Sequence, residues 1–166
     1  MLSYIITGAL LIVSLVVQMH PSFDVLKIAG VKPDILFIII VYMGYSFGSF
    51  NGEVSGFIGG ILQDSVSTGP LGLLTFPKVA VGMLIGFFGR DVIKSTILSI
   101  TLIMFLASLI KGVITLFLCY IFHQAQAEQI YKIILPESFY NAILSPLLFL
   151  LLDKIFENDL DKEARP

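Results

Sequence analysis

The amino-acid sequence predicts an all-α membrane protein with six transmembrane helices. The first reason is composition: 57% of the 166 residues are hydrophobic and only 13% are charged, whereas soluble domains average about 25% charged residues. The second is that apolar stretches approaching the roughly 20 residues that a helix needs to cross a hydrocarbon core recur along the chain. The third is that the segments between them are too short for a soluble domain.

Residues 2–19 form the first predicted span. This stretch has neither a basic segment before it nor a small-residue cleavage site after it, so we expect a retained helix rather than a signal peptide. Residues 20–32 then mix apolar side chains with Asp24 and Lys27. This mixture suits a short segment that lies in the membrane interface.

The second and third spans are predicted to form a close hairpin. Pro33 and Asp34 open the second span, because proline fits a first helical turn and a carboxylate suits the positive end of the helix dipole. Residues 34–48 and 52–64 each provide only about 20 to 22 Å of helix, less than the hydrocarbon thickness. Two short helices that turn through residues 48–52, shielded by longer neighbours, resolve this mismatch.

Glycines at helical spacing predict a tightly packed centre. Gly52, Gly56 and Gly60 recur every fourth residue, so they line one helix face and let a neighbouring backbone approach closely. The same spacing recurs on the two adjacent spans, at Gly44 and Gly48 and at Gly82 and Gly86. We therefore expect the second, third and fourth spans to pack backbone against backbone.

The third span is predicted to end at an acid beside a shaped loop. Asp64 closes the helix, and Gly69, Pro70 and Gly72 follow. A Gly-Pro pair cannot continue a helix and is typical of a tight turn. We expect this loop to hold the acid in place for other proteins to recognise.

The rest of the chain supplies two longer spans. After the fourth span at residues 71–88, residues 95–122 form the longest predicted helix, about 42 Å. Residues 123–135 predict a surface helix, Pro136 is expected to begin the last span, and Pro146 to kink it. One transmembrane domain, residues 1–156, is thus followed by a charged tail, residues 157–166.

The basic residues predict that both termini are cytoplasmic. Six spans place the termini on one side, together with five basic residues: Arg90, Lys94, Lys154, Lys162 and Arg165. The other side carries three: Lys27, Lys32 and Lys132. Because cytoplasmic loops are enriched in Lys and Arg, the larger group marks the cytoplasm.

Five polar residues are predicted to converge at one depth, in the outer half of the membrane: Asp34, Asp64, Lys78, Lys111 and Asn141. Charges in a bilayer cost about 2.5 to 3.5 kcal/mol on insertion scales, so they pair or line a wet cavity. One interpretation pairs Asp34 or Asp64 with Lys78 or Lys111. The other leaves both acids at the headgroup level while Lys78 extends outward. For Lys111, which is set deepest, pairing is favoured.

Several classes of function are disfavoured. A net charge of −2 without a basic stripe argues against nucleic-acid binding. Neither a nucleophile elbow, a zinc-binding HExxH motif nor a phosphate-binding loop is present. We therefore expect no enzymatic activity, no metal and no cofactor. A small ion-coupled transporter fits the buried charges but not the absence of a second repeat.

Nearly the whole chain resembles MreD, a family of bacterial rod-shape-determining membrane proteins, and the resemblance is specific from Pro33 to about Gly89. The resemblance is carried by Pro33-Asp34 before an apolar helix, by the glycine-rich helix that ends at Asp64, and by the turn from Gly69 to Gly72. It implies a non-enzymatic scaffold of the inner (cytoplasmic) membrane that binds MreC. The scaffold would support cell shape and lateral peptidoglycan synthesis with MreB, RodA and a penicillin-binding transpeptidase.

The resemblance also implies a fold similar to the S components of energy-coupling-factor transporters. A vitamin-binding S component is therefore the alternative function. The S-component family usually carries Ala-x-x-x-Ala on its first helix, but here Ala9 is followed four residues later by Val13. The roles of Lys78 and Lys111 match no family motif and rest on the burial argument alone.

Overall fold

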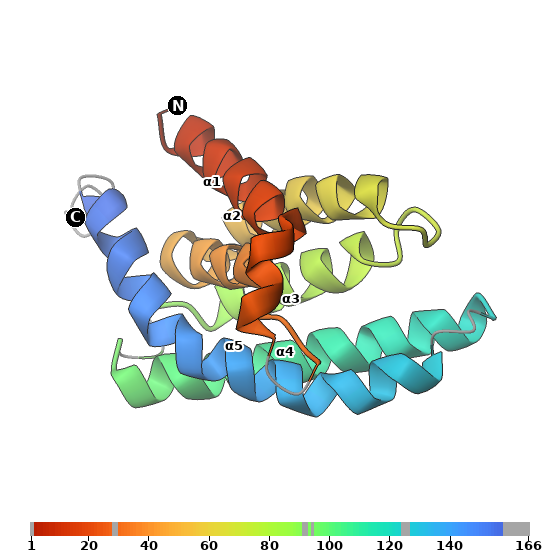
Figure 1. Cartoon of the computed structure of the whole chain (residues 1–166). Coiled ribbons are helices and arrows are strands. Elements are labelled where there is room, and N and C mark those ends of the chain that lie inside the picture. The colour runs from red at the N-terminus through yellow and green to blue at the C-terminus, as the bar shows by residue number, and fades with distance from the viewer. Residues whose placement is uncertain (1, 28–29, 91–92, 94, 124–126, 158–166) are drawn as a thin grey trace.

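The computed structural model describes residues 2–27, 30–90, 93, 95–123 and 127–157. The secondary-structure elements in these residues are all helices (Figure 1). In chain order they are α1 (Leu2–Met19), the 3₁₀ helix η1 (Pro21–Leu26), α2 (Ile35–Val66), α3 (Thr75–Phe87), α4 (Ile97–Ile121) and α5 (Ala127–Ile155).

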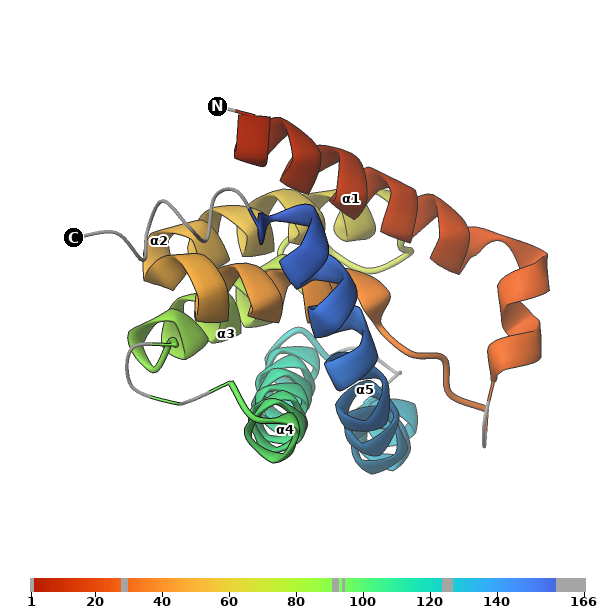
Figure 2. The ribbon, with the colours of Figure 1, turned by 90° about the vertical axis from the view of Figure 1, so that its left-hand side faces the viewer.

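The helices lie in two crossed layers. α2 and α3 pack together in one layer, with α1 lying over α2 on the side away from α4 and α5, and α4 and α5 run side by side across the other face (Figures 1 and 2). The last part of α5 turns away from α4 and packs beside the first half of α2, where the Phe149 ring meets the Tyr42 ring at 5.2 Å (Figure 2). This change of direction agrees with the kink predicted at Pro146, which lies inside α5.

α1 and η1 match the first predicted span and the segment that follows it. η1 is capped by His20, whose imidazole Nδ1 accepts a hydrogen bond from the Ser22 N–H at 3.2 Å. On its exposed side, Asp24 forms ion pairs with Lys27 and Lys32. Hydrogen bonds from Lys32 and Lys27 hold the pKa of the Asp24 carboxyl below its usual value.

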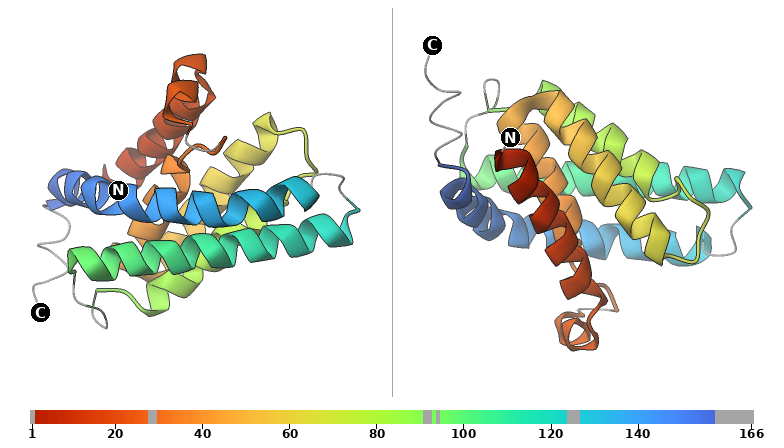
Figure 3. Two further views of the ribbon diagram at one scale, coloured as in Figure 1. Left: turned by 60° about the horizontal axis from the view of Figure 1, so that its bottom comes forward. Right: turned by 90° about the horizontal axis from the view of Figure 1, so that it is seen from above.

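α2 reverses direction at Gly48, as the hairpin prediction requires. Gly48 has φ +85° and ψ 174°, a conformation that glycine adopts without steric penalty. In a straight helix Gly44 and Gly52 would be about 12 Å apart, yet a Cβ built on Gly52 lies 2.8 Å from the Gly44 Cα. α2 therefore consists of two antiparallel parts, a first arm (residues 35–47) and a second arm (residues 49–66), which Figure 3 shows from above.

The glycine strip on the second arm packs against α3, which confirms the predicted centre. A Cβ on Gly56 would lie 2.8 Å from the carbonyl oxygen of Lys78, and a Cβ on Gly60 would lie 2.5 Å from the Cα of Thr75. A Cβ on Gly52 would lie 2.7 Å from the carbonyl carbon of Gly82 in α3. Real Cβ contacts are not this short, so only glycine permits the two helices to approach so closely.

α4 and α5 pack against each other, and this contact corrects the prediction of a separate surface helix. Residues 127–135 are the beginning of α5, and Pro136 lies inside that helix rather than opening it. A Cβ on Gly112 of α4 would lie 2.8 Å from Ile134. Ile134 therefore packs against α4, whereas Lys132, Ile133 and Leu135 beside it are exposed. Residues 124–126 of the same prediction lie outside the described residues.

The predicted all-α membrane class is confirmed, but the count of six separate spans is not. The described residues contain five α-helices, because the two arms predicted as the second and third spans form one element, α2, that turns at Gly48. By length and composition α4 and Lys132–Ile155 of α5 could each cross a membrane. α2 has the length and composition as well, but its 32 residues are divided between the two arms, and α1 and α3 are shorter apolar helices. The likeness to the six-helix S-component fold finds no support in this arrangement. Residues 158–166 of the predicted tail lie outside the described residues.

Arg90 closes the end of the molecule that lies opposite Asp34. Its backbone N–H donates to the Tyr45 carbonyl at 3.0 Å, and its guanidinium pairs with Asp153 of α5. The same Asp153 oxygen accepts the Tyr42 hydroxyl at 2.9 Å. The chain after α3, the first arm and the end of α5 are thus tied together, a set of contacts that we call the Arg90 clamp.

Candidate functional site

The start of α2 places Asp34 among four helices. Asp34 is 8% exposed and caps α2, because its Oδ1 accepts the Phe37 N–H at 3.1 Å. Its own N–H donates to Oδ1 of Asn141 on α5 at 2.8 Å. Pro33 is buried and lies immediately before this cap. The prediction that these two residues open the helix is therefore confirmed.

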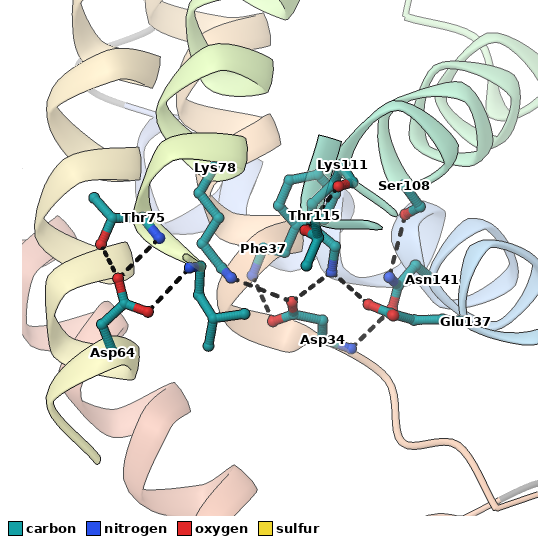
Figure 4. A network of polar contacts seen from close by, with 11 residues as sticks. Asp34, Phe37, Asp64, Thr75, Lys78, Ser108, Lys111, Thr115, Glu137 and Asn141 are labelled. Carbon is teal, nitrogen blue, oxygen red and sulfur yellow. Dashed lines mark hydrogen bonds and ion pairs between the residues drawn. The ribbon is translucent and has the colours of Figure 1, made fainter. Parts of the chain in front are cut away.

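Lys111 of α4 is the main partner of Asp34. Its Nζ lies 2.8 Å from the Asp34 Oδ2, also pairs with Glu137 of α5, and sits 4.5 Å from the centroid of the Phe37 ring. Lys111 is only 7% exposed, so its charge depends on these two carboxylates. The predicted pairing of this deepest lysine is confirmed (Figure 4).

Lys78 of α3 reaches the same carboxylate from the other side. Its Nζ lies 3.9 Å from the Asp34 Oδ2, and the side chain points inward toward Asp34 (Figure 4). Because Lys78 is 2% exposed, the alternative in which it extends outward to the headgroups is wrong.

Asn141 completes the arrangement by donating from Nδ2 to the Ser108 Oγ at 3.2 Å. We call Asp34, Lys78, Lys111, Glu137 and Asn141 the polar cluster. Its two carboxylates and two ammonium groups have formal charges that cancel. Such mutual compensation is what allows charges to lie within a membrane protein.

Asp64 lies outside the polar cluster and organises the loop after α2. Its carboxylate accepts the N–H groups of Gly72, Leu74 and Thr75 at 2.8, 3.0 and 3.1 Å, and the Thr75 hydroxyl at 2.5 Å. Asp64 has no ion pair among the described residues, so of the two acids predicted as possible partners of Lys78 or Lys111 only Asp34 forms the pairs. At 2% exposure it is also inaccessible to a partner, which overturns its expected role as a recognised acidic tip.

The loop that Asp64 holds contains the three predicted turn residues. Gly72 has φ +97°, a left-handed conformation that favours glycine. Gly69 and Pro70 are partly exposed, and a Cβ on Gly69 would lie 3.2 Å from the side chain of Leu73. The loop predicted from Gly69 to Gly72 is therefore a shaped turn whose conformation depends on a buried acid.

Two adjoining cavities lie between the polar cluster and this loop. The first, of about 280 Å³, is lined by charged members of the polar cluster, by loop residues and by the Gly112–Thr115 turn of α4. The second, of about 430 Å³, shares Asp34, Gln63 and Glu137 with the first and extends to the end of α1. Gln63 Oε1 and Gln18 Nε2 are buried there without a hydrogen-bond partner among the described residues.

The sequence prediction missed Glu137 and Gln63. Glu137 precedes Asn141 by four residues on α5, and residues four apart share one helix face. That spacing was a usable signal, because Asn141 was already among the predicted polar residues. Gln63 carries no such signal, since its place beside the cavity depends on the α2 reversal and on the loop.

The polar cluster joins helices that are distant in sequence, and its carboxylates are used in ion pairs within the chain. Within the described residues no group of three or more His, Cys, Asp or Glu side chains could hold a metal ion. Fold and site together define a polytopic helical membrane protein whose interior is held by compensated charges.

Comparison with known families identifies the family to which this protein belongs. Residues 1–158 match the family model described as rod shape-determining protein MreD, and the chain belongs to this family. No individual curated protein matches it significantly. Family membership makes the chain a rod-shape-determining membrane protein and favours this function over the S-component alternative.

Proposed function

We propose that the protein is a non-enzymatic scaffold of the elongation (rod) complex in the bacterial cytoplasmic membrane. It binds MreC and, indirectly, supports lateral peptidoglycan synthesis by RodA and a penicillin-binding transpeptidase alongside MreB. Membership of the MreD family carries this proposal. The buried ion pairs add support, because a fixed arrangement of helices presents a defined outer surface to partners.

The partner surface that we propose is the outer face of α4. This helix is 25 residues long, and exposed apolar residues follow helical spacing along most of it: Leu98, Leu102, Leu106, Val113 and Phe117. A helix of this length, about 38 Å, matches a partner's single transmembrane helix over its whole membrane span. The described loops are short, so a helix face is the larger surface on offer.

The orientation that we propose places both ends of the chain in the cytoplasm. The start of α1 and the end of α5 lie on the same side of the molecule (Figures 1 and 3). Arg90 lies on this side, because it pairs with Asp153 near the end of α5. Reporter fusions at the two ends test the orientation, and a periplasmic signal from either end contradicts it.

Site-specific photo-cross-linking tests the binding surface. A photoreactive residue at Leu106 should yield an adduct with MreC in membranes, whereas the same residue at Ile12 on the exposed face of α1 serves as the matched control. Equal yields at the two positions argue against an α4 surface. Deletion of the chromosomal copy tests the function itself: rods should become round, and unchanged shape without a second copy overturns the proposal.

A further inference from the structure

Lys78 presents unused hydrogen-bond donors to the first cavity. An ammonium has three donors, but the closest ionic partner of the 2%-exposed Lys78 among the described residues is Asp34 at 3.9 Å. Lys111, by contrast, holds two carboxylates. A buried charge with so little compensation is costly. An oxyanion or another hydrogen-bond acceptor in the cavity that Lys78 lines would therefore stabilise its ammonium group.

Gln63, in contrast to Lys78, lacks a hydrogen-bond donor for its side-chain oxygen among the described residues. Its Oε1 is buried, has no hydrogen-bond partner among the described side chains, and borders both cavities. Glu137, which lines the same cavities, has one described ionic partner, Lys111. An occupant that also carries a hydrogen-bond donor, such as an ammonium group, satisfies both of these acceptors.

The charge of the first cavity indicates that the occupant has no net charge. The lining carries two acids, Asp34 and Glu137, and two bases, Lys78 and Lys111. A simple anion at Lys78 would leave an uncompensated negative charge beside Glu137, which burial penalises. A zwitterion brings the oxyanion and the ammonium together.

The second cavity connects this polar region to the apolar surface. It is bounded by Met19 at the end of α1 and by Val66 at the end of the second arm. These side chains are 57% and 49% exposed. An occupant with a polar head in the first cavity can thus extend an apolar chain outward between α1 and the second arm.

We propose that the two cavities bind a zwitterionic phospholipid. Its phosphate lies at Lys78, its ammonium faces Gln63 and Glu137, and one acyl chain leaves past Met19 and Val66. The proposal does not depend on the scaffold function, because it rests on the cavity contacts alone.

Titration of the detergent-purified protein with short-chain phosphatidylethanolamine tests this proposal. Ligand binding to the folded state should raise the melting temperature by on the order of 5 °C at about 100 times the dissociation constant. Short-chain phosphatidylglycerol, which is anionic, should give a smaller shift. An equal shift with free phosphoethanolamine assigns the site to a soluble zwitterion and overturns the lipid proposal. No shift with either zwitterion overturns it completely and leaves cavities that hold water only.

Two variants locate the binding. Gln63→Leu and Lys78→Met should each weaken phosphatidylethanolamine binding by at least about tenfold, because each loses a hydrogen bond to a charged group. Ser65→Ala is the control on the same arm, since its hydroxyl bonds within its own helix, to the Ile61 carbonyl. If Lys78→Met fails to fold, the phosphatidylethanolamine affinity of Gln63→Leu alone tests the proposed site. A Gln63→Leu protein that binds the lipid as tightly as Ser65→Ala contradicts the proposed site.

Discussion

Single residues in the polar cluster differ in how much of the fold depends on them. Lys111 compensates Asp34 at 2.8 Å and also holds Glu137, whereas Lys78 approaches Asp34 only to 3.9 Å. Removing one partner of a buried ion pair is strongly destabilising because the other charge is stranded. The two lysines, although both buried, should therefore respond differently to the same substitution.

We expect Lys111→Met to destabilise the protein by about 3 to 5 kcal/mol and Lys78→Met by no more than about 2 kcal/mol. The first change strands Asp34 and Glu137, while the second leaves Asp34 with its main partner. The amount of monodisperse protein after heating, followed by size-exclusion chromatography, measures the difference. Equal losses for the two variants would show that the Lys111 pairs do not dominate.

Asp64→Asn should destabilise the loop between α2 and α3. The carboxylate accepts four hydrogen bonds, and an amide turns one of its acceptors into a donor that faces other donors. The expected loss is about 1 to 3 kcal/mol, and limited proteolysis within residues 67–74 measures it. Ser65→Ala is the neighbouring control, and a loop equally resistant in both variants speaks against this role.

Whether the contacts of a single residue can be predicted from the sequence depends on whether its partners are side chains or backbone groups. That Lys111 forms an ion pair was predicted correctly because a lysine placed deep in a span needs an acid, but the sequence left both Asp34 and Asp64 open as that acid. Asp64 was misjudged because three of its four donors are backbone N–H groups. Every residue except proline has such a group, so no pattern of side chains in the sequence predicts the contact.

At the scale of elements, the glycine strip determines how the second arm and α3 pack. The strip was predictable because helical spacing is a local property of sequence: Gly52, Gly56 and Gly60 fall on one face whatever the rest of the chain does. The start of α5 was not predicted correctly. Pro136 was expected to open a helix, yet proline is tolerated within membrane helices when neighbouring helices support the freed backbone groups.

Two glycine substitutions should therefore have opposite effects. Gly56→Ala places a methyl group 2.8 Å from the Lys78 carbonyl and should destabilise the protein, by about 1 to 3 kcal/mol for overpacking. Gly8→Ala in α1 meets nothing within 4 Å and should be neutral or stabilising by up to about 1 kcal/mol. Thermal stability of both variants checks the pair. A neutral Gly56→Ala would mean that the two backbones can separate without loss.

At the scale of the whole molecule, the polar cluster and the Arg90 clamp fix opposite ends of the first arm. The sequence analysis used Arg90 only to predict orientation. Its pairing with Asp153 was not foreseen, because 63 residues separate the two and the contact requires the end of α5 to turn back toward α2. Contacts of this kind follow from the complete arrangement of helices, not from any one of them.

The clamp predicts coupling between residues of two distant elements. Arg90→Gln and Asp153→Asn should each lower stability, and the double variant should lose about 1 kcal/mol less than the sum, which is the size expected for a partly exposed pair. The Arg90 and Asp153 side chains are 28% and 34% exposed, so their coupling should also weaken with salt. Additive losses in the double-mutant cycle would rule out a direct interaction.

The placement of Asp34 also has a consequence for biosynthesis. This carboxylate leaves the ribosome early, but its partners come from positions 78, 111 and 141. A nascent chain that has inserted only its first helices thus carries an acid that nothing yet neutralises. The interior is completed when the final helix arrives, so chains truncated before that point should be natural targets for membrane proteases.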